Sequence, residues 1–64
     1  MGPVALELSR QAVALTLACR QAEAEQAVFA VAEAVRDGSA RVEGRHAIDV
    51  AFNLALAGER AAEC

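Results

Sequence analysis

The sequence has few of the residues on which small folds and binding sites commonly depend. It contains no tryptophan, tyrosine or lysine, and only two phenylalanines, one proline and two cysteines. Two cysteines are too few for the disulfide framework of a small secreted domain. Six scattered arginines and a net charge of −3 do not provide the concentrated positive charge that nucleic-acid binding requires. We therefore exclude direct binding to DNA or RNA.

Signals for membrane insertion or export are also lacking. The longest predominantly apolar run, residues 12–19, is far shorter than the roughly 20 residues that span a bilayer. The N-terminus has no basic region, and Glu7 interrupts its apolar run. These absences predict a cytoplasmic protein that does not bind membranes. In that compartment, Cys19 is expected to pack as a free thiol on an apolar stripe, and Cys64 to lie on a fraying tail.

Alanine dominates what is present, at 17 of the 64 positions. It favours helix strongly but contributes little apolar area to a core. A chain of this length buries only about 60% of the surface that it exposes when unfolded. Because 56% of the residues are hydrophobic, some apolar helical surface is expected to face another polypeptide.

Apolar spacing predicts one small all-α unit, residues 1–64, made of two amphipathic helices. The expected order is a long helix over about 3–37, a short glycine-containing connector over 38–44, a helix over about 45–57, and a polar tail over 58–64. The segment 20–27 has no large apolar residue, and is compatible with either a straight helix or a kink. The helices would form a hairpin or wrap around a partner.

The candidate binding residues are the large apolar side chains of these segments. Val28, Val31 and Val35 recur at steps of three and four, a seam suited to a partner helix. The second helix is apolar around more than half of its circumference. The predicted partner-binding residues are Val28, Val31, Val35, Val42, Ile48 and Phe52. Gly38 and Gly44 are the predicted hinges, and Gly38 is suited to the positive φ that ends a helix.

Side chains capable of chemistry are sparse. Glu43, His46 and Asp49 follow one another at steps of three, a spacing compatible with a metal or acid–base cluster. The same residues also suit the solvated edge of a helix near its N-terminus, and this interpretation is favoured. Cys19 has no histidine nearby in sequence to activate it. We expect no catalytic, metal, cofactor or small-molecule site, and hence no enzyme.

The stretch VFAVAEAVRDGSARVE, residues 28–43, resembles the C-terminal half of the FlgM-type flagellar anti-sigma factors. Members of that family carry an amphipathic helix that ends in a basic residue, Asn or Asp, and Gly. An apolar–acidic pair and a second helix that opens with Ile-Ala then follow. The matching residues are Val28, Val31, Ala34 and Val35 in the helix, Arg36, Asp37 and Gly38 at its end, Val42 and Glu43 in the pair, and Leu6 to Ser9 in a leading Leu-Ser motif.

Three features depart from the family's pattern. Ala40 stands where a large apolar residue is usual, and Ala47-Ile48 reverses the Ile-Ala order. The flexible N-terminal half that the family uses for export is absent or very short.

The resemblance implies a regulator whose helices cover the flagellar sigma factor and keep it from core RNA polymerase. Such a chain would be partly ordered when free and would fold on its partner. The residues themselves leave an alternative open, a helical hairpin that dimerises through the same seam into a four-helix assembly. The expected partner is therefore either another protein, such as a sigma factor, or a second copy of the chain.

Overall fold

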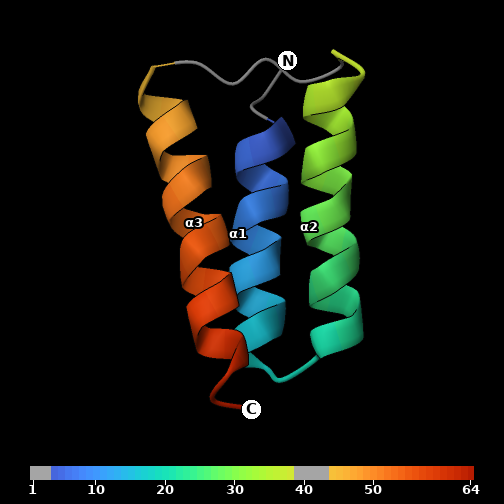
Figure 1. Cartoon of the computed structure of the whole chain (residues 1–64), viewed down its shortest axis with the longest axis vertical. Helices are drawn as coiled ribbons and strands as arrows, with labels where there is room; N and C mark the ends of the chain where they lie inside the picture. Colours follow the sequence, from blue (N-terminus) through green and yellow to red (C-terminus); the bar gives the residue numbers. More distant parts are fainter. Residues whose placement is uncertain (1–3, 39–43) are drawn as a thin grey trace.

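The computed structural model describes residues 4–38 and 44–64, which form three α-helices and no strand (Figure 1). The helices are α1 (Val4–Leu17), α2 (Gln21–Arg36) and α3 (Arg45–Ala61). α1 packs against both other helices, whereas α2 and α3 scarcely contact each other. The predicted all-helical class is confirmed, and the number of helices differs from the prediction.

The difference arises because the span predicted as one helix over 3–37 is two antiparallel helices. The chain reverses at Cys19, whose φ of +57° is left-handed. The N–H of Cys19 donates to the Thr16 carbonyl (2.9 Å), and that of Arg20 donates to the Leu15 carbonyl (2.9 Å). This pair of bonds is the Schellman pattern, in which glycine usually occupies the left-handed position. The break thus precedes the segment 20–27, and residues from Gln21 onward are helical.

A disulfide joins this turn to the last residue of the chain. Cys19 and Cys64 are bonded, with their Cα atoms 5.6 Å apart and a sequence separation of 45. The expectations of a buried free thiol at Cys19 and a fraying tail at Cys64 were therefore wrong. Both residues are exposed, and the bond fixes the C-terminus beside the α1–α2 turn.

α3 also continues past the glycine at which the sequence predicted its end. The predicted helix over 45–57 extends to Ala61, so Gly58 lies inside it and only the last part of the predicted tail 58–64 is outside. Arg60, in the last turn of α3, donates to Glu63 beyond the helix at 3.0 Å. Ala57 is buried against the other helices, and this packing outweighs the weak helix propensity of the neighbouring glycine.

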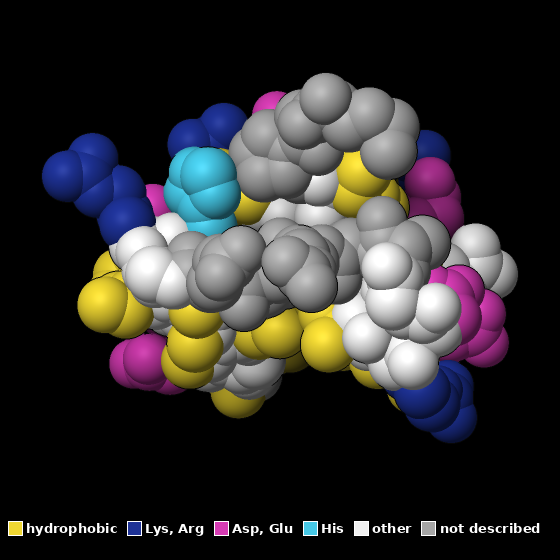
Figure 2. Space-filling view, turned by 90° about the horizontal axis from the view of Figure 1, so that it is seen from above, with side chains coloured by type: hydrophobic (Ala, Val, Ile, Leu, Met, Phe, Trp, Pro, Cys, Tyr) yellow, Lys and Arg dark blue, Asp and Glu magenta, His cyan; other side chains and the backbone are white. Residues whose placement is uncertain are grey.

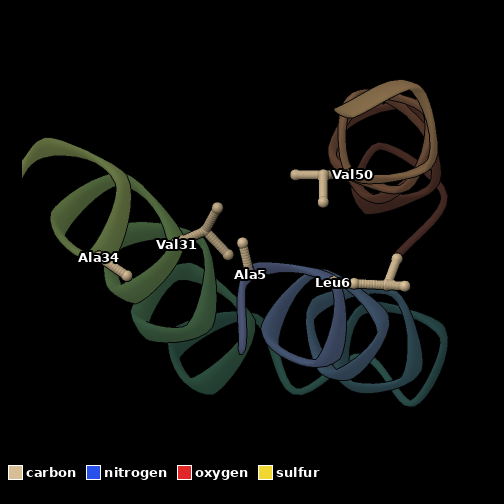
Figure 3. Packing of buried hydrophobic residues seen from close by; sticks show 5 residues of the cluster. All are labelled: Ala5, Leu6, Val31, Ala34 and Val50. Carbon is tan, nitrogen blue, oxygen red and sulfur yellow. The ribbon is translucent and has the colours of Figure 1, made fainter. Parts of the chain in front are cut away.

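The core is small and consists mainly of alanine and valine. Its upper cluster is formed by Ala5, Leu6, Val31, Ala34 and Val50, and its lower cluster by Ala12, Ala27 and Ala57. Ala5 lies toward α2 and Leu6 toward α3, so neighbouring residues of α1 pack against different helices (Figure 3). The alanines allow close approach of the helix backbones but bury little apolar area.

Two buried hydroxyl residues, Ser9 and Thr16, lie within this core. The Ser9 hydroxyl donates to the Leu6 carbonyl (2.8 Å) and accepts a bond from Asn53 Nδ2 (3.1 Å). Through the second of these bonds, Asn53 connects α3 to α1. No buried side-chain nitrogen or oxygen of the described residues lacks a hydrogen-bond partner.

We predict that reducing the disulfide lowers the free energy of unfolding by up to about 4 kcal/mol, because the unfolded chain regains the entropy of an open loop of this length. Chemical denaturation with and without a dithiol reductant measures the change. In the Cys64→Ser variant the reductant should have no effect. Equal stability of the oxidised and reduced chains would contradict this prediction.

A second prediction concerns the alanine contact at the centre of the fold. Ala12 is fully buried, so Ala12→Leu overpacks the contact of α1 with its neighbours and should destabilise the chain by about 1–3 kcal/mol. Ala14→Leu, at an exposed position of the same helix, is the matched control and should change stability by less than about 0.5 kcal/mol. Thermal unfolding followed by circular dichroism compares the two variants, and similar effects would contradict the packing.

Candidate protein-binding site

An apolar groove runs between α2 and α3, on the side that α1 does not cover. Its upper part has a volume of 440 Å³ and almost no polar side chain apart from one arginine. The residues that line it are Val28, Val31, Ala32, Val35, Arg36, Ala47, Val50, Ala51 and Leu54. Val31 of α2 and Val50 of α3 point into the space between the helices and form its floor (Figure 3). We call this surface the α2–α3 groove.

The groove continues toward the end of the molecule that holds the C-terminus. A smaller hollow of 170 Å³ lies there, and shares Val28 and Leu54 with the upper part. The residues that line only this lower part are Thr16, Gln21, Ala24, Glu25, Phe29, Ala57 and Gly58. Together the two hollows extend along most of the length of α2 and α3.

Large apolar side chains also stand exposed beside the groove. Phe29 and Val35 of α2 are 65% and 48% exposed, and Ile48 and Phe52 of α3 are 71% and 64% exposed. In the view from above, hydrophobic side chains gather on the left, where α3 lies, and continue along the lower edge of the molecule toward α2 (Figure 2). The accessible surface of 4403 Å² exceeds the value of about 3,900 Å² expected for a compact monomer of 6.7 kDa.

Charged residues mark the two ends of this surface. Arg36 ends α2 and Arg45 begins α3, so both lie at the upper end, whereas Glu25 and Glu59 lie toward the lower end. The ion pairs that join two described residues are Glu7–Arg10, Arg20–Glu23 and Arg60–Glu63, and they include none of these four side chains. Of these four, Arg36 lines the upper part of the groove and Glu25 its lower part, so the groove has a cationic side chain at one end and an anionic one at the other.

The structure places the predicted partner-binding residues in two groups. Val28, Val31 and Val35 line the groove, with Val31 buried at its floor. Ile48 and Phe52 project from the exposed face of α3, and Val42 lies outside the described residues. Among the residues that the prediction omitted are Val50 and Leu54, which form much of the α3 wall. Ala47, Val50 and Leu54 follow one another at steps of three and four, and this spacing could have predicted that they share one face of the helix.

The two predicted hinge glycines both have left-handed backbones. Gly38 follows α2 with a φ of +79°, and its N–H donates to the Val35 carbonyl at 3.3 Å. Gly44 precedes α3 with a φ of +60°, and its carbonyl accepts a bond from the Ala47 N–H at 3.1 Å. A side chain at either position would be strained whatever space surrounds it. The rest of the predicted connector, residues 39–43, lies outside the described residues.

Nothing in the described ranges assembles a metal site or a membrane span. Among residues 4–38 and 44–64, no group of three or more histidine, cysteine, aspartate or glutamate side chains could hold an ion. His46 and Asp49 lie in the first turns of α3, and Glu43, the third member of the cluster considered in the sequence, is outside the described residues. None of the described helices is both long enough and apolar enough to cross a bilayer.

Comparisons of the chain with protein-family models, with curated proteins and with solved structures find no match. The resemblance to the FlgM-type proteins therefore rests on the short motifs quoted above.

We predict opposite effects of alanine at two glycines. Gly38→Ala places a side chain at a positive φ and should destabilise the chain by about 1–2 kcal/mol. Gly58→Ala, the matched control inside α3, has open space around the new methyl group and should stabilise the chain by roughly 0.5–1 kcal/mol. Denaturant unfolding of both variants tests this difference in sign, and stabilisation by Gly38→Ala would contradict the left-handed conformation.

Proposed function

We propose that this chain is a non-enzymatic helical protein-binding module that holds an apolar helix of its partner in the α2–α3 groove. The observation that supports this proposal is the groove itself, in which two helices that scarcely touch each other present valine, leucine and alanine side chains. Exposed apolar surface of this extent, bordered by charged residues, is typical of protein interaction sites.

The arrangement resembles a helical bundle in which one position is empty. α1 covers one side of the space between α2 and α3, and the other side, which is the α2–α3 groove, is open. A partner helix could occupy that side with apolar residues at i, i+3, i+4 and i+7, as amphipathic helices do in other hydrophobic grooves. The open length, from Ala24 near one end to Val35 near the other, corresponds to roughly three helical turns.

The resemblance to FlgM-type proteins suggests a specific form of this function. In that form the chain would bind the flagellar sigma factor in the cytoplasm and repress transcription by keeping the factor from core RNA polymerase. The cytosol is reducing, so the Cys19–Cys64 bond would be open there. Loss of the bond would loosen the attachment of α3 and favour the partly ordered state in which that family binds its partner.

We predict that a charge on the wall of the groove impairs partner binding. Val35→Glu introduces a carboxylate at the groove and should weaken binding by about tenfold or more. Leu17→Glu is the matched control, because Leu17 is 62% exposed but lies on α1 away from the groove. Isothermal titration with purified flagellar sigma factor, under reducing conditions, measures both variants against the parent chain.

Each alternative result has a separate meaning. Absence of binding by the parent chain would reject the anti-sigma form of the proposal. Equal loss of binding in the two variants would reject the groove as the contact surface. Transcription by sigma-loaded polymerase, with and without the chain, then tests whether binding represses transcription.

A further inference from the structure

We propose that the occupant of the α2–α3 groove is the same surface of a second copy, related by a twofold axis perpendicular to the helices. In this dimer α2 lies antiparallel to the second copy's α2, and α3 antiparallel to the second copy's α3. The four helices enclose a shared core, with the two α1 helices outside. This inference rests on the proposed function, since it names the partner of the surface described there.

The first support is the pattern of residues on the exposed face of α2. Glu25, Phe29, Ala32 and Arg36 follow one another at steps of four, three and four, and therefore lie on one face of the helix. All four residues are exposed. When this stripe is paired with an antiparallel copy centred between Phe29 and Ala32, Glu25 faces the second copy's Arg36. The same pairing places the ring of Phe29 against the second copy's Ala32.

α3 carries a second charged stripe on its exposed side, although none of its three residues lines either hollow of the groove. Arg45 and Glu59 each stand seven residues from Phe52, at opposite ends of the helix. An antiparallel pairing centred on Phe52 places Arg45 near the second copy's Glu59 and brings the two Phe52 rings together. Each helix therefore offers opposite charges at the two ends of an apolar centre.

The two centres lie at the same height in the molecule, which allows one axis to serve both helices. Val28 and Leu54 border both hollows of the groove and so lie at one level, and Val31 and Val50 belong to one core cluster. The midpoint between Phe29 and Ala32 on α2 is thus level with residues 51 and 52 on α3. One twofold operation consequently satisfies the charge pairs of both helices at once.

Charge also disfavours the parallel alternative. Arg36 and Arg45 lie at one end of the surface, and Glu25 and Glu59 lie at the other. A dimer with parallel faces would place the arginines of both copies together, and likewise the glutamates, without an ion pair among the described residues to compensate them. Such like-charge contacts oppose association, whereas the antiparallel dimer converts them into four attractive pairs.

A heteromeric partner and the second copy would use the same groove residues, so the two modes of binding exclude each other. In the dimer the apolar lining of the groove, including Val28, Val35 and Leu54, becomes the interior of a four-helix bundle. The exposed side chains of Phe29 and Phe52 are also covered.

Sedimentation of the full oxidised chain over a series of concentrations tests the dimer. The expected result is a reversible species of twice the 6.7 kDa chain mass. Glu25→Arg and Arg36→Glu should each weaken the dimer by about tenfold, because either change makes both symmetric copies of that contact repulsive. Arg10→Glu is the matched control for Arg36→Glu, since it makes the same change of charge at an exposed position of α1.

Restoration of the dimer is the diagnostic measurement. An equimolar mixture of the Glu25→Arg and Arg36→Glu chains, or the double variant, should regain the affinity of the parent chain. Positions 25 and 36 are about 16 Å apart along one helix and cannot pair within a chain, so recovery reports a contact between copies. Circular dichroism of each variant verifies that its helix content is unchanged.

A chain that stays monomeric up to millimolar concentration would overturn the inference, as would a dimer that the charge reversals neither weaken nor restore. A monomer that still bound sigma factor through Val35 would leave the proposed function intact. A dimer of the expected register without sigma binding would support this inference and reject only the anti-sigma form.

Discussion

Packing of α1 against both α2 and α3 is the interaction on which the rest of the structure depends. α2 and α3 scarcely contact each other, so each owes its position mainly to α1. Two neighbouring residues of α1, Ala5 and Leu6, make the two contacts (Figure 3), and the small Ala12 further along the helix allows close approach. This arrangement needs only small side chains in the core, but it leaves the other faces of α2 and α3 uncovered. The groove is the direct consequence of a core centred on one helix.

This geometry connects the composition of the chain with its proposed function. Alanine stabilises helices without filling the space between them, and the few larger apolar residues are divided between the core and the exposed face. Val31 and Val50 contribute to both, because they contact α1 and also form the floor of the groove. A partner bound there would extend an existing core rather than create a new one. Both the heteromeric and the self-associated forms exploit this property.

Much of the helical content could be predicted from local sequence, whereas the reversal of the chain could not. The end of α2 at Gly38 was predicted because glycine readily adopts a left-handed backbone after a helix. The equivalent position after α1 is Cys19, and cysteine gives no such signal. The α1–α2 turn depends on a distant residue, Cys64, which no local pattern connects to it. A long helix was therefore the natural interpretation of residues 3–37.

Only part of the candidate surface could be predicted, again because local sequence does not show which residues meet in space. The valine seam of α2 was visible from its spacing, but α3 is apolar around so much of its circumference that spacing alone did not distinguish core, groove and exposed positions. Val50 proved to be buried, Ile48 to be exposed, and Leu54 to lie at the groove. Asn53 illustrates the converse, since its contact with Ser9 depends on how α3 is rotated against α1. Such assignments require tertiary structure.

The Cys19–Cys64 bond gives the chain an unusual covalent topology. Residues 19–64, which include α2 and α3, form a macrocycle, and α1 extends from that ring as a linear branch. The two helices that hardly touch are thus the two that share the ring, while the helix that contacts both is attached to it at one point. Cleavage of one peptide bond within the ring would release no fragment, whereas cleavage between α1 and Cys19 would detach the helix that organises the core.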